Sequence, residues 1–140
     1  MIRNFAPSDI NCVMDIWLDE NVEAHSFIPQ SYWTDHYETV KAEILRAEVY
    51  VYEADDTIIG FVGVVGNYIA GLFVKQQHRA TGVGTELLTH LKRLKSSLVL
   101  HVYAENKSAV AFYEKMGFQI TSNREDANAG QVEYEMLWCR

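Results

Sequence analysis

The sequence predicts an α/β (α+β) fold, in which helices cover a mixed sheet, and three observations support this. β-rich segments joined by short polar turns follow one another between residues 49 and 74, as in an antiparallel meander. Residues 85–94 carry leucines at helical spacing, and a second apolar strand, 98–103, comes next. A strand that returns through a helical crossover lies parallel to the strand before the helix, so the sheet must be mixed.

The first elements are read from caps and periodicity. A short strand at about residues 2–5 precedes a first helix, for which Ser8 or Asp9 is the expected cap. Apolar residues at helical spacing predict a second helix that begins after Ser31 or Thr34 and ends near Arg46.

The connection between these two helices is unusually aromatic for a solvated loop. It runs from His25 to Trp33, contains Phe27 and Tyr32, and is broken by Pro29. It is either a buried lid or a wall of a binding site.

The remaining elements follow from turn residues. Residues 49–52 and 58–65 pair around Asp55 and Asp56, and Gly66 with Asn67 leads into strand 68–74. A fourth helix, 107–116, ends at Gly117, and strands 119–122 and 131–138 form a closing hairpin across the polar loop 123–130. The predicted order is β-α-α-β-β-β-α-β-α-β-β.

Composition limits the class of protein. The 140 residues are 49% hydrophobic, which fits a single domain over 1–140. No run of about eighteen apolar residues and no signal-peptide core occur, so we expect a cytoplasmic protein without a membrane partner, as a monomer or homodimer. A net charge of −7 argues against nucleic acid and favours cationic partners, although mild acidity also serves solubility. Cys12 and Cys139 have no metal-ligand spacing, and we interpret both as packing residues.

The loop between strand 68–74 and the third helix predicts an anion site. It reads Arg79-Ala80-Thr81-Gly82-Val83-Gly84, and closely spaced glycines before a helix let backbone N–H groups approach phosphates. A P-loop would require a lysine and a serine or threonine after the last glycine, where Thr85 and Glu86 stand. A dinucleotide fingerprint would place a third glycine at Leu87.

A third interpretation uses two further segments. Leu72-Phe73-Val74-Lys75 precedes the loop, and Asn106-x-x-Ala109-x-x-Phe112-Tyr113-x-Lys115-x-Gly117-Phe118 follows the next strand. With Arg79-x-x-Gly82-x-Gly84, this combination resembles the GCN5-related N-acetyltransferases (GNAT) in small bacterial form, directly over residues 57–120. Two departures are Gln76, where a proline is common, and Ala80, where a glycine is common.

The resemblance implies a GNAT-like sheet in which strands 68–74 and 98–103 splay apart, and a single N-acetyltransferase domain. It implies acetyl-CoA as the acetyl donor and no metal. The pantetheine arm would pair with the end of strand 68–74, and the loop would hold the pyrophosphate, with Asn106 as a further hydrogen-bonding partner or simply a helix cap. The implied cofactor-binding residues are Leu72, Phe73, Val74, Arg79, Ala80, Thr81, Gly82, Val83, Gly84, Thr85 and Asn106.

The implied reaction is direct acetyl transfer to a primary amine, of a small molecule or of a protein lysine or N-terminus. Tyr113 stands at the family's general acid, although periodicity alone would make it a core tyrosine. Strand 68–74 has no carboxylate, although some relatives place the base there. His101 stands where relatives that acetylate protein N-termini carry a glutamate base, so the resemblance makes it the predicted base, with His25 second and a water chain as the alternative. The expected acceptor walls are His25, Phe27, Trp33 and Tyr68, with Glu125 and Asp126 at the mouth. The competing hypothesis is a non-catalytic acyl-CoA-binding sensor or interaction module.

Overall fold

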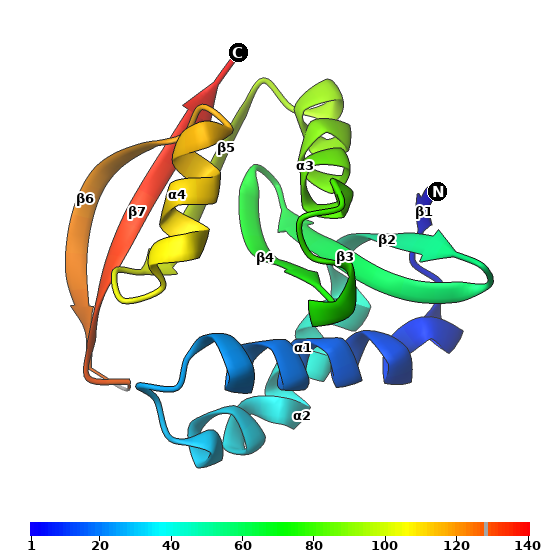
Figure 1. Ribbon diagram of the computed structural model, residues 1–140, viewed down its shortest axis with the longest axis horizontal. Coiled ribbons are helices and arrows are strands. Elements are labelled where there is room, and N and C mark those ends of the chain that lie inside the picture. The colour runs from blue at the N-terminus through cyan, green and yellow to red at the C-terminus, as the bar shows by residue number, and fades with distance from the viewer. Residues whose placement is uncertain (128) are drawn as a thin grey trace.

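Seven strands form one mixed sheet in the part of the chain that the computed structural model describes, residues 1–127 and 129–140 (Figure 1). The spatial order is β1-β2-β3-β4-β5-β7-β6, and only β4 and β5 among these neighbours run parallel. The predicted fold class and element order are confirmed. The strands are β1 (Ile2–Asn4), β2 (Glu48–Ala54), β3 (Thr57–Val65), β4 (Tyr68–Val74), β5 (Ser97–Tyr103), β6 (Gln119–Asp126) and β7 (Gln131–Cys139).

Helices pack on both faces of the sheet and divide the core in two. One apolar cluster joins the sheet to α3 and α4, and the other joins it to α1 and α2. Strand β3 is buried along most of its length because it contributes to both clusters, with Val62 on the α3 side and Phe61 on the α1 side. The helices are α1 (Ile10–Ala24), α2 (Gln30–Arg46), α3 (Val83–Leu94) and α4 (Lys107–Lys115), with short 3₁₀ turns at Pro7–Asp9 and Gln76–His78.

Strand β4 parts from β5 after a very short ladder. Only Tyr68 with Val99 and Ile69 with Leu100 are paired between them. On its other side β4 pairs with β3 as far as Val74, with a register shift that leaves Ala70 as an extra residue. A bulge of this kind bends a strand and increases its twist, which directs the second half of β4 away from β5. The gap that opens is visible between β4 and β5 in Figure 1.

Several boundaries differ from those predicted. Helix α2 begins at Gln30, directly after Pro29, so Ser31 and Thr34 lie inside its first turns and do not cap it. Strand β6 extends to Asp126, so the first half of the predicted polar loop 123–130 is strand; Asn128 lies outside the described residues. Cys12 and Cys139 are exposed, so their interpretation as packing residues is wrong. None of the described helices is both long and apolar enough to cross a membrane.

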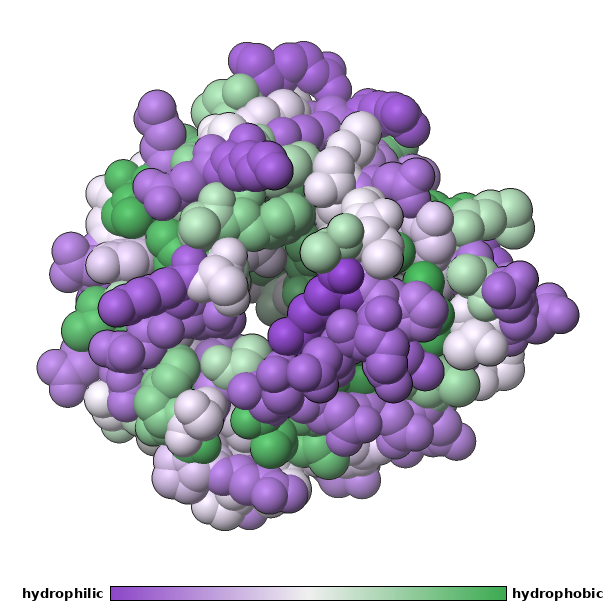
Figure 2. All heavy atoms as spheres, viewed as in Figure 1, coloured by the Kyte–Doolittle hydropathy of each residue, from purple (hydrophilic) through white to green (hydrophobic). Residues whose placement is uncertain are grey.

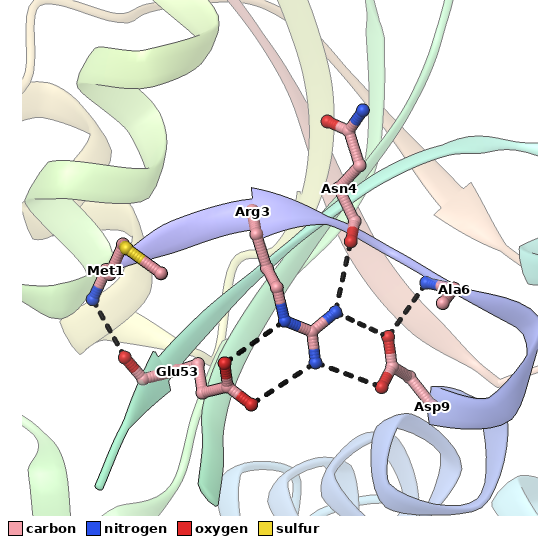
Figure 3. Close-up of polar contacts among 6 residues, drawn as sticks. All are labelled: Met1, Arg3, Asn4, Ala6, Asp9 and Glu53. Carbon is pink, nitrogen blue, oxygen red and sulfur yellow. Dashed lines mark hydrogen bonds and ion pairs between the residues drawn. The ribbon is translucent and has the colours of Figure 1, made fainter. Parts of the chain in front are cut away.

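An ion cluster fixes the N-terminus to the sheet (Figure 3). The Arg3 guanidinium donates to both carboxylate oxygens of Asp9, at 2.8 and 3.1 Å, and its Nε donates to Glu53 at 3.2 Å. The Asp9 carboxylate also accepts from the backbone N–H of Ala6, at 2.8 Å. Asp9 thus holds the turn before α1 and makes no side-chain cap to α1 itself, contrary to the expected capping role.

We expect Asp9→Asn to lower the free energy of unfolding by about 1–3 kcal/mol at pH 7, because it weakens hydrogen bonds to a charged partner. The Arg3 guanidinium lowers the pKa of Asp9, so the ionised carboxylate stabilises the fold above the ordinary aspartate pKa of about 4. That contribution is lost as the pH falls through the lower pKa of the folded state. Urea unfolding of wild type and Asp9→Asn between pH 7 and pH 2.5 should therefore give free energies of unfolding that converge in acid. A difference between the two that stays constant with pH would contradict a role for the ionised Asp9 carboxylate.

Candidate functional site

A cavity of about 720 Å³ lies where β4, α1 and α4 meet the start of α3. Figure 2, drawn from the same side as Figure 1, shows a hollow near the middle of the molecule, in the region of this cavity. Its floor is the end of β4, and its sides are the start of α3 and one face of α4. The lining residues are Glu20, Ala24, His25, Leu72, Phe73, Val74, Arg79, Ala80, Gly82, Gly84, Thr85, Asn106, Ser108, Ala109, Phe112, Tyr113 and Lys115.

Nine of the predicted cofactor-binding residues line this cavity: Leu72, Phe73, Val74, Arg79, Ala80, Gly82, Gly84, Thr85 and Asn106. Two do not. The Val83 side chain is buried in the core beneath α3, and Thr81 is exposed and donates its hydroxyl to the carbonyl of His78. A role for either must therefore come from its backbone.

The glycine-rich loop ends in a helix N-terminus beside the cavity. Gly82 has a φ of +89° and α3 begins at Val83, so the loop turns into the helix through a left-handed residue. Ala80 also has a positive φ, +62°, which costs an alanine about 1–2 kcal/mol and explains the preference for glycine there. The first N–H groups of a helix lack partners within it and attract anions.

Arg79 does not supply a free positive charge to this loop. Its guanidinium donates to the carboxylate of Glu23 at 2.7 Å and to that of Glu20, both on α1. These ion pairs fasten the loop to α1 along the edge of the cavity. Attraction for an anion must then come chiefly from backbone N–H groups and the helix end.

Gly82→Ala tests the loop with a closely matched control. A Cβ would meet no atom within 4 Å at Gly82 or at Gly66, and both have positive φ, so the backbone penalty should be similar. Gly66 lies in the β3–β4 turn, outside the cavity. We expect both variants to lose about 1–2 kcal/mol of stability, and only Gly82→Ala to weaken acetyl-CoA binding, about tenfold. Calorimetric titration measures this, and equal affinities in the two variants would argue against phosphate binding here.

Tyr113 reaches the same cavity from α4. Its ring is buried between Phe112 and Phe118, with ring centroids at 5.3 and 5.6 Å. Within the described residues its hydroxyl has no hydrogen-bond partner, and burial raises the pKa of the phenol. The Tyr113 hydroxyl therefore stays protonated and can donate a hydrogen bond to a ligand in the cavity.

Asn106 and His25 bridge α4 and α1 at the edge of the cavity. Nδ1 of His25 lies 3.1 Å from the carbonyl oxygen of Asn21, which can only accept, so this nitrogen carries the hydrogen. Nε2 of His25 then accepts from the Asn106 amide at 3.1 Å, while Oδ1 of Asn106 accepts from Ala109 N–H and caps α4. Burial lowers the pKa of His25 and keeps it neutral. Both ring nitrogens are occupied, so His25 is ill placed to act as the base.

His101 lies at the point where β4 and β5 separate, one residue beyond their last pair. Its Nδ1 is 3.3 Å from the Tyr68 hydroxyl and its Nε2 is 3.4 Å from the Glu135 carboxylate. Glu135 stands directly across from His101 on β7. Sequence reasoning missed Glu135, because only the register of β5 with β7 brings these two residues together.

The predicted acceptor walls fall into two groups. His25, Phe27 and Trp33 form one aromatic cluster with Tyr103, in which His25 stacks on Trp33 at 5.2 Å. Tyr68 instead contacts His101, at a ring distance of 5.4 Å. The mouth residue Asp126 accepts a hydrogen bond from Tyr103, at 3.0 Å. The described residues contain no group of three His, Cys, Asp or Glu side chains that could hold a metal ion.

Comparison with known families and proteins adds independent information. The acetyltransferase (GNAT) domain matches residues 46–120, more than half of the chain. The peptidyl-lysine N-acetyltransferase YiaC of Escherichia coli is 32% identical over 122 residues, which cover 86% of this chain and 84% of that protein. The E. coli peptidyl-lysine N-acetyltransferase YjaB is 29% identical over 117 residues, which cover 83% of this chain and 80% of that protein.

Solved structures agree with the fold. The apo form of YjaB from E. coli superposes with a TM-score of 0.86 at 26% identity, covering 99% of this chain and 96% of that one. A proposed streptothricin acetyltransferase from Bacillus anthracis, solved in complex with acetyl coenzyme A, gives a TM-score of 0.62 at 25% identity and covers 67% of this chain and 62% of that one.

Proposed function

This chain belongs to the GNAT family of acetyltransferases and is an acetyl-CoA-dependent N-acetyltransferase, and we propose that its acceptors are lysine side chains of proteins. The names of its relatives YiaC and YjaB, both peptidyl-lysine N-acetyltransferases, support this choice. The charge near His101 supports it as well, since the Glu135 carboxylate lies 3.4 Å from Nε2 of the histidine. A carboxylate so placed favours an acceptor that arrives as a cation.

The chemistry of the cavity lining supports acetyl-CoA as its ligand. A phosphate group suits the left-handed Gly82 and the start of α3. The second half of β4 has no strand partner on its β5 side, and an amide-bearing chain can use the backbone groups that face this gap. When bound, the donor supplies the acetyl thioester; transfer forms an amide bond to the acceptor nitrogen and breaks the carbon–sulfur bond.

One observation supports the proposed mechanism: Tyr113 and His101, the proposed proton donor and proton acceptor, lie on opposite faces of the sheet at the gap between β4 and β5. Tyr113 packs with the α3 and α4 cluster, to which Leu100 and Val102 of β5 also belong. His101 alternates with these two residues along the strand and so occupies the other face. An amine that approaches from the His101 face loses its proton there, and the departing sulfur gains one from Tyr113 on the cavity side.

The contacts of His101 define how the proton would move. The Glu135 carboxylate can only accept, so Nε2 of His101 carries the hydrogen and Nδ1 accepts from the Tyr68 hydroxyl. The ammonium can then lose a proton to the Tyr68 oxygen while Tyr68 passes its own proton to Nδ1. Glu135 stabilises the imidazolium that results, as a positioning residue.

The function is tested by mixing the protein with acetyl-CoA and a library of lysine peptides, small amines and peptides with free N-termini, and following free thiol and peptide mass. We expect turnover of lysine peptides, with acetylation on Nε. A preference for small amines would show that the acceptors are small molecules and not protein lysines. Saturable acetyl-CoA binding without turnover of any amine would instead favour the binding-module hypothesis.

A further inference from the structure

A second cavity, of about 410 Å³, lies on the opposite side of the sheet from α3, between α2 and strands β3 and β4. Most of its lining is apolar, and its polar groups are Glu43 and Arg46 of α2 and Tyr68 of β4. The lining residues are Trp17, Val40, Glu43, Ile44, Arg46, Ala47, Val49, Phe61, Gly63, Val65, Tyr68, Ala70, Gly71 and Phe73.

The cavity exists because the strands carry small residues opposite α2. Gly63 and Gly71 are cross-strand partners, and Ala70 is the extra residue of the β4 bulge. A Cβ built on Gly63 would meet only Val49, at an ordinary 3.7 Å. A larger side chain at position 63 could therefore occupy the cavity without moving its neighbours.

Two residues connect this cavity to the reaction centre. Phe73 lines both cavities, and its ring covers Gly71, where a Cβ would lie only 2.5 Å from it. Tyr68 lines the second cavity and contacts His101. An acceptor whose amine reaches Tyr68 thus brings its neighbouring groups to the mouth of the second cavity.

We propose that this cavity binds an aliphatic side chain of the acceptor protein, within about three residues of the lysine that is acetylated. The proximity follows from Tyr68, which both lines the cavity and contacts His101, and an extended chain advances about 3.3 Å per residue, so only residues near the lysine can reach the cavity. Val65, an apolar residue 61% exposed at the rim, gives such a side chain an apolar entry from solvent. Glu43 and Arg46 give the lining one charge of each sign, so the preference rests on its apolar surface. The proposal rests on the proposed function and specifies which lysines are chosen.

The experiment compares lysine peptides that carry leucine or serine at each position within about three residues of the lysine. Burial of most of a leucine side chain is favourable, so we expect leucine at the preferred position to raise kcat/KM about tenfold over serine. Gly63→Val, which places a branched side chain suited to a strand in the cavity and narrows it, should reduce the preference and leave activity on the serine peptide and the affinity for acetyl-CoA unchanged. Val65→Ser should weaken the preference, whereas Leu94→Ser, which removes a similarly exposed apolar residue from α3, should leave it intact.

A binding arm separates failure of this proposal from failure of the proposed function. Leucine peptides in which norleucine replaces the lysine cannot be acetylated, so calorimetry with them measures binding to the cavity alone. Wild type should bind these peptides more tightly than Gly63→Val does. Absence of turnover with every lysine peptide would overturn the acceptor assignment alone. Equal norleucine-peptide binding by wild type and Gly63→Val, or a leucine preference that survives both Gly63→Val and Val65→Ser undiminished, would overturn the cavity assignment.

Discussion

Tyr113→Phe is expected to lower kcat about 100-fold and to leave the affinity for acetyl-CoA unchanged. General acid catalysis contributes about 10²–10⁴-fold, and a thiolate is a sufficiently good leaving group that the lower end applies. The variant removes only the hydroxyl, because phenylalanine can keep the ring contacts with Phe112 and Phe118.

The pH dependence of this loss is the sharper measurement. Burial raises the pKa of Tyr113, and an acid acts while it is protonated, so wild type keeps its donor well above neutral pH. The ratio of wild-type to variant kcat should therefore be constant between pH 6 and 9. Tyr37→Phe, on α2 and outside both cavities, is the matched control and should retain full activity. Full activity of Tyr113→Phe would remove Tyr113 from the chemistry.

His101→Gln is the second large effect, again about 100-fold in kcat/KM at pH 7. Glutamine can still form hydrogen bonds to Tyr68 and Glu135, but it cannot take a proton. Wild type should lose activity on the acid side, because a base that already carries a proton cannot take one from the acceptor. In the variant this limb should vanish, and the rate should rise steadily with pH as free amine becomes available.

Glu135→Gln separates positioning from a purely structural role. If Glu135 fixes the His101 tautomer and stabilises the imidazolium, the variant should lose kcat and shift the acid limb while acetyl-CoA affinity stays constant. His36→Gln, on α2, controls for removal of a histidine as such.

An unchanged pH profile in His101→Gln would assign deprotonation to another group or to a water chain.

Local signals in the sequence predicted the meander, the cofactor loop and the order of elements. Asp55 and Asp56 both adopt positive φ in the β2–β3 turn, and Gly117, with a φ of +94°, ends α4. Each is a short-range preference, readable without knowledge of what packs around it.

The features that sequence reasoning missed depend on distant parts of the chain. The second half of β6, residues 123–126, is strand where the sequence predicts loop, because its side chains are almost all exposed at an outer edge of the sheet and show no apolar alternation. Glu135 lies beside His101 only through strand register, and nothing local indicates that Nε2 of His25 meets Asn106. The cavity at Gly63 is likewise a property of how α2 packs on the sheet.

The two-pair ladder between β4 and β5 also affects the tendency of the protein to aggregate. Beyond Ile69 and Leu100, part of each strand offers unpaired backbone groups inside the sheet, and such edges invite pairing with other extended chains. A pantetheine arm bound in the gap, as proposed above, would cover the β4 side. Backbone amides of β4 that face the gap should then exchange with deuterium more slowly when acetyl-CoA is present, and resistance to aggregation on heating should rise with the logarithm of the donor concentration. The cellular supply of acetyl groups would then govern the lifetime of the enzyme as well as its rate.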